Sequence, residues 1–228
     1  MDSLERAASA LSPIRAIVWG EYAMCFAGVK TICNDNMLVI QDSDVDAAIL
    51  SLHSAGFRDA AWSFGCTVDP ETLTDTKTQE YCRGAARTYR SINANSLRFE
   101  FPADAGKKES RLIIVRSSYA HFSLLSMPGT KFTYCGGVYF PDSELLLESF
   151  VKVRVRDTEP SAWTSMLTYW SITYLYGQLW LDDDVLDSSE DEEAKTWFNK
   201  MIRRFSGGLD RLPTKRRGRR APDTVRID

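Results

Sequence analysis

The stretch that decides the fold runs from Ile17-Val18-Trp19-Gly20-Glu21-Tyr22-Ala23 through Gly28-Val29-Lys30-Thr31, Asp35-Asn36-Met37-Leu38-Val39-Ile40 and Asp46-Ala47-Ala48 to Ser54-Ala55-Gly56-Phe57. Its compact apolar runs at 14–19 and 36–40 are typical of buried β-strands. The segments 21–27 and 45–54 predict helices, and a glycine follows each of them as a stop signal. The predicted order is therefore strand, glycine turn, helix, strand, helix.

The remainder of the chain adds strands first and helices afterwards. Residues 96–101 alternate, with Leu97, Phe99 and Phe101 on one side, which indicates a half-buried strand. Residues 66–81 are interpreted as a surface excursion and 103–109 as a turn. Further strands are expected at 111–117 and 138–140, and helices at 4–11, 143–154, 161–180 and from Ser189 to about Phe205.

These elements predict an α/β (α+β) fold, in which helices flank a mixed β-sheet and a helical part follows at the C-terminal side. The expected organisation is an α/β domain at 1–140, helices at 141–205 packed on it, and a disordered basic tail at 206–228. Residues 202–228 hold 9 of the 28 Lys and Arg residues but 3 of the 31 Asp and Glu residues. Such asymmetry indicates an extension with its own partner, or one that folds back on the body. The run from Lys215 to Arg220 could bind nucleic acid or direct nuclear import, although no aromatic residue interleaves it.

Composition excludes several classes of protein. With 44% hydrophobic and 26% charged residues, the 228-residue chain has the balance of a globular protein, and it lacks a run of apolar residues long enough for membrane insertion. The first residues lack the apolar core of a secretory signal. Five scattered cysteines without a CxxC pair indicate reduced thiols in the cytosol or nucleus. Only His53 and His121 are present, which almost excludes a histidine-rich metal site.

Taken together, the quoted stretch resembles the minimal nucleotidyltransferase fold, and it is most similar to the nucleotidyltransferase-like proteins of filamentous fungi. The resemblance covers residues 12–57 and continues more loosely through 97–101, 111–117 and 138–176. It rests on the order and spacing of the motifs. In that superfamily a hydrophobic-Gly-Gly/Ser turn accommodates a nucleotide phosphate, the second strand carries Asp-x-Asp, and a later strand supplies a third carboxylate.

The resemblance implies a metal site whose ligands are only partly present here. Alternate residues of a strand point to one face, so Asp-x-Asp places two carboxylates side by side to share Mg²⁺ ions with a nucleoside triphosphate. Asp35 stands at the first position but Met37 at the second, and a thioether is a poor ligand for a hard cation. Gly20 is present in the turn, whereas Glu21 replaces the small residue and would repel phosphate.

Glu100 is the best candidate for the third carboxylate, because it points away from the apolar side of its strand. If the chain is catalytic, Asp35 and Glu100 are the expected catalytic residues, and Gly20 and Glu21 are expected to contact the nucleotide. Glu21, Asp35 and Glu100 would then form a rearranged Mg²⁺ site. The alternative is that these three carboxylates are solvated or salt-bridged groups at strand ends.

Three functions stay open at this point. The first is a degenerate nucleotidyltransferase-fold protein that does not transfer nucleotides and binds a small molecule or a protein partner. The second is an active nucleotidyltransferase that uses Mg²⁺ and a nucleoside triphosphate in the rearranged site. The third is a repurposed protein of a fungal biosynthetic pathway, whose aromatic helices bind an apolar small molecule or simply form core. The aromatic residues concerned are Trp163, Tyr169, Trp170, Tyr174, Tyr176 and Trp180.

Overall fold

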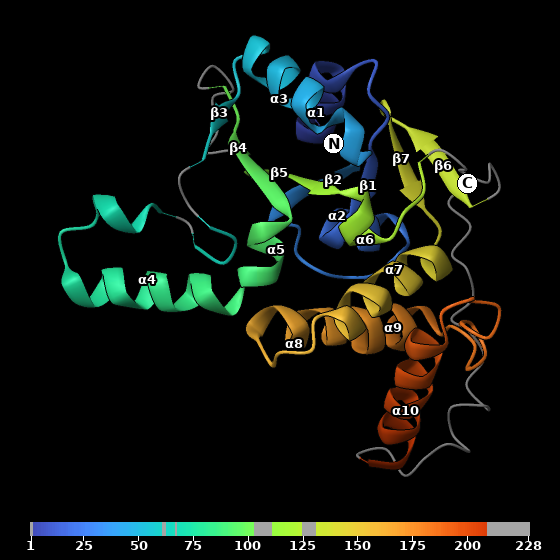
Figure 1. The fold of residues 1–228 in the computed structure, drawn as a ribbon. Coiled ribbons are helices and arrows are strands. Elements are labelled where there is room, and N and C mark those ends of the chain that lie inside the picture. The colour runs from blue at the N-terminus through green and yellow to red at the C-terminus, as the bar shows by residue number, and fades with distance from the viewer. Residues whose placement is uncertain (1, 61–62, 67, 103–110, 125–130, 209–228) are drawn as a thin grey trace.

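A computed structural model describes residues 2–60, 63–66, 68–102, 111–124 and 131–208 of the chain. Within these residues, seven strands form one mixed sheet in the order β3-β4-β5-β2-β1-β7-β6 (Figure 1). The strands are β1 (Ile17–Trp19), β2 (Asp35–Ile40), β3 (Arg58–Asp59), β4 (Ser96–Glu100), β5 (Arg111–Arg116), β6 (Phe132–Cys135) and β7 (Val138–Pro141). The predicted α/β class is therefore confirmed.

The register of the central strands sets which side chains share an end and a face of the sheet. Strand β2 runs parallel to β5 along its whole length, with Asp35 opposite Arg111. Strand β1 runs antiparallel to β2, with Trp19 opposite Met37. Because paired residues share a face, Trp19, Met37, Asp35 and Arg111 lie on the same face of the sheet. We call the end of the sheet where β1 finishes and β2 and β5 begin the glycine-turn end.

Helices cover both faces of the sheet (Figure 1). One face is covered by α1 and α3, where the Ser3 hydroxyl donates to Asn36 Oδ1 at 3.0 Å. The other face is covered by the C-terminal helices, and there the Trp19 ring contacts Phe150 and Trp163 at centroid distances of 5.3 and 6.0 Å. The helices are α1 (Asp2–Leu11), α2 (Gly20–Phe26), η1 (Asp42–Asp44), α3 (Val45–Ser54), η2 (Pro70–Thr72), α4 (Thr76–Thr88), α5 (Arg90–Ala94), α6 (Ser117–Ala120), α7 (Ser143–Arg156), α8 (Ala162–Thr168), the π-helix η4 (Tyr169–Tyr176), α9 (Gly177–Leu179) and α10 (Glu192–Gly208).

One buried apolar cluster joins the sheet to the C-terminal helices. It extends from Leu4 in α1, through β1 and the apolar residues 112–115 of β5, to Ile202 in α10. Each buried Leu, Ile, Val or Phe side chain contributes about 1.5–3 kcal/mol relative to an exposed one. The helices after residue 141 therefore pack on the sheet and complete its core.

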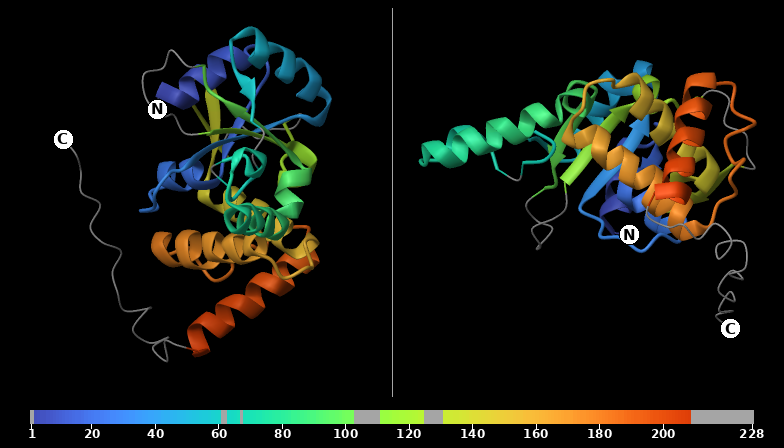
Figure 2. Two further views of the ribbon diagram at one scale, coloured as in Figure 1. Left: turned by 90° about the vertical axis from the view of Figure 1, so that its left-hand side faces the viewer. Right: turned by 90° about the horizontal axis from the view of Figure 1, so that it is seen from below.

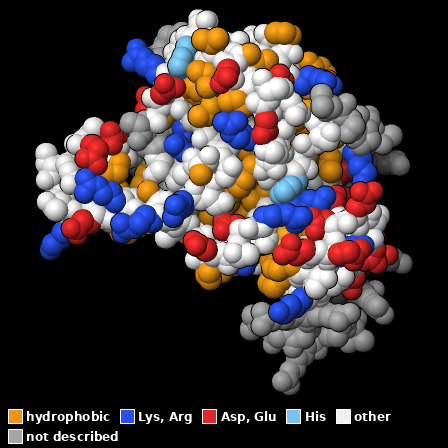
Figure 3. Space-filling model, viewed as in Figure 1, with side chains coloured by type: hydrophobic (Ala, Val, Ile, Leu, Met, Phe, Trp, Pro, Cys, Tyr) orange, Lys and Arg blue, Asp and Glu red, His pale blue; other side chains and the backbone are white. Residues whose placement is uncertain are grey.

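Several local predictions differ from the structure. Residues 76–88 form the helix α4, which projects from the body and carries Lys and Arg side chains along it (Figures 2 and 3). This helix buries only Cys82, so the sequence has no apolar stripe to reveal it. Strand β6 was not expected. The helix predicted at 161–180 changes to a π-helix at Tyr169, and Trp180 ends it in a left-handed conformation with φ 56°.

The last helix begins later than its sequence suggests. Ser189 lies before the helix, where its hydroxyl donates to Glu148 Oε1 at 2.6 Å and accepts from the Asp191 amide at 3.2 Å. The Asp191 side chain instead accepts from the Ala194 amide at 3.0 Å. The turn expected at 103–109 and the tail beyond 208, including Lys215 to Arg220, lie outside the described residues. None of the helices in the described part of the chain is both long and apolar enough to span a bilayer.

Candidate functional site

Gly20, the residue expected to contact nucleotide phosphate, follows β1 directly and has a φ of +67°. This left-handed conformation favours glycine. A Cβ at this position would lie only 2.6 Å from the Met37 Sδ atom and 3.5 Å from Trp170 Cη2. Met37 itself is 1% exposed. The space beside the glycine turn is therefore filled by the methionine side chain, at the position where the resemblance implies a second metal-binding carboxylate.

Asp35 is the first residue of β2 and is 6% exposed. Arg111, opposite it in the parallel register, donates from Nε to Oδ1 at 2.6 Å and from Nη2 to Oδ2 at 2.8 Å. This two-pronged geometry is the strongest that an arginine makes with a carboxylate. Arg111 Nη1 also donates to the carbonyl oxygen of Cys66. Both oxygens of Asp35 thus have an internal cationic partner.

Glu21 begins α2 beside Asp35 and is also held by the protein itself. The Asn34 amide donates to Oε2 at 2.6 Å, and Asn34 Nδ2 donates to Oε1 at 3.3 Å. Burial raises the pKa of Glu21, and the neighbouring Asp35 charge raises it further, against the lowering effect of the Asn34 hydrogen bonds. The Glu21 carboxylate therefore holds Asn34, and with it the end of the segment 27–34, against α2.

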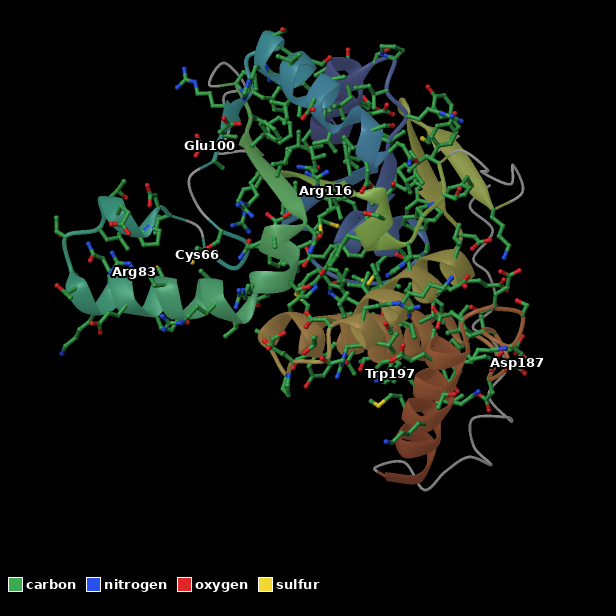
Figure 4. The ribbon with its side chains drawn as sticks, in the orientation of Figure 1. Cys66, Arg83, Glu100, Arg116, Asp187 and Trp197 are labelled. Carbon is green, nitrogen blue, oxygen red and sulfur yellow. The ribbon has the colours of Figure 1, made fainter. Side chains whose placement is uncertain are left out.

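Glu100 lies at the same end of the sheet but does not join the other carboxylates. It is exposed at the end of β4, opposite Arg58 of β3 (Figure 4). Strand β5 separates β4 from β2, so two strand spacings, or about 10 Å, lie between the backbones of Glu100 and Asp35. Among the described residues, no group of three or more His, Cys, Asp or Glu side chains could hold a metal ion. The structure thus brings Gly20, Glu21 and Asp35 together and leaves Glu100 apart.

A cavity of about 340 Å³ opens at the opposite end, where β2 and β5 finish. We call it the polar cavity. Its lining residues come from α5, α6 and α7 and the turns after them: Ser91, Asn95, Ser118, Tyr119, His121, Val153, Arg156 and Asp157. Sequence reasoning named only His121 among them, as one of two histidines. The others are ordinary polar residues far apart in the chain, and no local pattern marks them.

His121 ends α6 in a left-handed conformation with φ 56°. Burial lowers the pKa of His121, and the positive charges of Arg156 and Lys152 lower it further, although Asp191 acts in the opposite direction. The imidazole is therefore neutral at pH 7. It presents one donor and one acceptor, as a group for hydrogen bonding rather than a fixed charge.

Two hydrogen-bonded groups hold the wall of the polar cavity in place. Asp42, after β2, accepts from the Ser117 hydroxyl at 2.9 Å and from the Ser118 amide at 3.0 Å, which fixes the start of α6. The Tyr119 hydroxyl accepts from Trp163 Nε1 at 2.7 Å and lies 3.1 Å from the Ser91 hydroxyl. Burial raises the pKa of Tyr119 to about 12. Hydrogen bonds within the protein therefore fix this wall, and Tyr119 itself is a neutral hydroxyl at pH 7.

The large aromatic side chains of α8 and η4 do not line the polar cavity. Trp163, Trp170 and Tyr176 are buried at 0, 3 and 2% exposure and belong to the core. Tyr169 and Trp180 are exposed on the surface. A second, wider groove of about 700 Å³ lies between α1 and α3 and is lined in part by Arg6, Leu50 and Ser54.

No protein-family model matches the chain, and the comparison with curated proteins finds no relative. Among solved structures, the chain is similar to JHP933 from Helicobacter pylori, with 12% sequence identity and a TM-score of 0.34. The match covers 92% of this chain and 95% of that one. Similarity at this level carries no argument about function.

Proposed function

We propose that this chain is a nucleotidyltransferase-like protein that has lost nucleotidyl transfer and acts by binding a small polar ligand. The observation that carries the proposal is the state of the glycine-turn end. There, Met37 fills the space beside Gly20, and Arg111 takes both oxygens of Asp35. A triphosphate with its Mg²⁺ would need this space and these oxygens. This arrangement favours a binding protein over an active enzyme with a rearranged metal site.

The polar cavity is the proposed binding site. In open α/β sheets, ligands bind outside the carboxyl ends of parallel strands, and the polar cavity lies at that end of the parallel pair β2 and β5. Its lining offers hydroxyl, amide, imidazole, guanidinium and carboxylate groups. A ligand with several hydrogen-bonding groups fits this lining, whereas an apolar one, as in the biosynthetic alternative, does not.

Nucleotidyl transfer is tested by incubating the purified protein with Mg²⁺ and each of the four labelled nucleoside triphosphates. We expect no transfer of label to protein, nucleic acid or small acceptors. Label transfer that disappears in Asp35→Ala would overturn the proposal, because it would show that Asp35 still serves a metal.

Ligand binding is tested by a thermal-shift screen of small polar compounds. Asp157→Phe fills the polar cavity without removing a hydrogen bond described for the Asp157 side chain. Ser54→Phe, in the groove between α1 and α3, is the matched control. We expect compounds that raise the melting temperature of the wild type and of Ser54→Phe but not of Asp157→Phe. A shift lost in Ser54→Phe instead would move the site to the other face.

A further inference from the structure

Two cysteines lie in contact beside the glycine turn. Cys25 is in the last turn of α2, and Cys33 precedes β2. Their Sγ atoms are 2.9 Å apart, and the Cys25 thiol also lies 3.6 Å from the Thr31 carbonyl oxygen. The sequence suggests five unrelated reduced thiols, because these two are separated by seven residues and form no known redox motif. The fold brings this pair together.

The two sulfur atoms lie only slightly farther apart than in a disulfide. An S–S bond is about 2.05 Å long, so the two sulfur atoms need to approach by only about 0.9 Å. The segment between them is short and has turn-forming residues, so small backbone shifts can supply that movement. Both side chains are half-buried rather than enclosed, which leaves a small oxidant access to them.

We propose that Cys25 and Cys33 form a reversible disulfide when the protein meets hydrogen peroxide. Each thiol loses its hydrogen, and one bond forms between the two sulfur atoms. The two protons and two electrons released reduce one molecule of hydrogen peroxide to two molecules of water. A dithiol reductant reverses the change by thiol–disulfide exchange, which restores the two protein thiols and leaves the reductant as its own disulfide.

The other cysteines are placed differently. Cys66 and Cys82 are both buried, and the Cys66 thiol donates to the Cys82 carbonyl oxygen at 3.2 Å. Cys135 lies in β6, away from the glycine turn. Burial and the neighbouring Cys25 raise the pKa of Cys33 to about 12, so Cys33 is a neutral thiol at pH 7.

The bond would act on the segment that leads into β2 at the glycine-turn end. Residues 27–34 are already held by Glu21 at Asn34 and by Gln178 Oε1, which accepts from the Lys30 amide at 3.0 Å. A disulfide adds a covalent link between the end of α2 and the residues before Asp35. Oxidation therefore adds a covalent link to this segment, and reduction returns it to its hydrogen bonds and to the packing of Val29 in the core.

Peptide mapping of the full-length wild type tests the proposal. The folded protein is treated with hydrogen peroxide, its remaining thiols are blocked with N-ethylmaleimide, and it is digested with trypsin. Cleavage after Lys30 separates the two cysteines into peptides 16–30 and 31–58. We expect these two peptides to be linked, the link to vanish on reduction, and the count of free thiols to fall from five to three.

Controls separate this bond from general oxidation. Cys135→Ser should keep the linked peptides, and Cys33→Ser should lose them. Oxidation in guanidinium chloride should scatter the links among all five cysteines. The proposal is overturned if the folded wild type keeps five thiols, if Cys66 and Cys82 are linked instead, or if Cys25 and Cys33 are oxidised separately to sulfinic acids.

Discussion

At the glycine-turn end of the central strands, Asp35 and Glu21 are bound by other groups of the protein, whereas at the opposite end polar side chains line an open cavity. Asp35 and Arg111 form a closed pair, and Met37 fills the space beside Gly20. At the other end, hydrogen bonds to Asp42 and Tyr119 hold the wall of the polar cavity, and Ser118 and His121 are among the residues that line it. The difference teaches that the carboxylates at the glycine-turn end have internal partners, while the polar groups that line the cavity lie where the sequence shows no motif.

The largest effect is expected from breaking the closed pair. Arg111→Ala leaves the Asp35 carboxylate, whose side chain is 8% exposed, without its cationic partner. Removing one member of a buried ion pair costs more than the pair contributes, so the free energy of unfolding should fall by about 4 kcal/mol. Urea denaturation of the wild type and of Arg111→Ala measures this difference in the free energy of unfolding.

The matched control replaces both members with apolar residues. Asp35→Leu with Arg111→Met should recover most of the lost stability, because no uncompensated charge remains. If Arg111→Ala is as stable as the wild type, the pair is not the structural element described here.

A somewhat smaller loss is expected when the glycine turn is filled. Gly20→Ala forces a Cβ into the left-handed region and against Met37 Sδ, and together these should cost about 3 kcal/mol of unfolding free energy. In a Met37→Ala background the same substitution should cost about 1.5 kcal/mol, because only the backbone strain remains. Equal costs in both backgrounds would show that Met37 does not occupy the turn.

At the polar cavity, we expect the ionisation of Tyr119 to lower the free energy of unfolding at alkaline pH. The folded-state pKa is about 12 against an ordinary value of 10, so the folded protein keeps a proton that the unfolded chain releases. The contribution is intact below pH 10 and is lost as pH rises toward 12, by about 2 kcal/mol. Denaturant melts between pH 9 and pH 12 measure this slope, and Tyr119→Phe should show a shallower one. Identical slopes in the wild type and in Tyr119→Phe would contradict the role given to Tyr119.

The smallest effect is expected from Asp42→Ala, which removes the acceptor at the start of α6. The loss should be about 1 kcal/mol at pH 7, as for other helix-capping residues. Burial acts to raise the pKa of Asp42, but hydrogen bonds from Ser118 and Ser117 outweigh it and lower the pKa. The contribution is therefore present above the ordinary pKa and disappears on acidification below it, so wild type and variant should converge at low pH. A constant difference down to pH 2 would contradict this.

Much of the fold could be predicted because it follows from apolar periodicity. The strands near 17–19, 35–40, 96–100 and 111–116 bury apolar side chains and are visible in the sequence. Helix α4 could not be predicted, because it projects from the body and buries almost nothing. The π-helix after Thr168 depends on packing across the core, to which no local sequence pattern corresponds.

The sequence predicts the candidate residues that lie in one continuous stretch, but not the contacts that depend on tertiary structure. Gly20, Glu21 and Asp35 belong to one continuous stretch, so their common location could be predicted from the order of elements. The pairing of Asp35 with Arg111 depends on the parallel register of β2 and β5, 76 residues apart. The polar cavity and the contact between Cys25 and Cys33 likewise depend on tertiary structure.

The most direct test of the account is isothermal titration of the protein with each nucleoside triphosphate in the presence of Mg²⁺. The closed glycine-turn end predicts no saturable heat at ligand concentrations up to about 1 mM, which corresponds to a binding free energy weaker than about −4 kcal/mol. Saturable binding to one site, abolished by Asp35→Ala and retained in Asp157→Phe, would contradict the central claim.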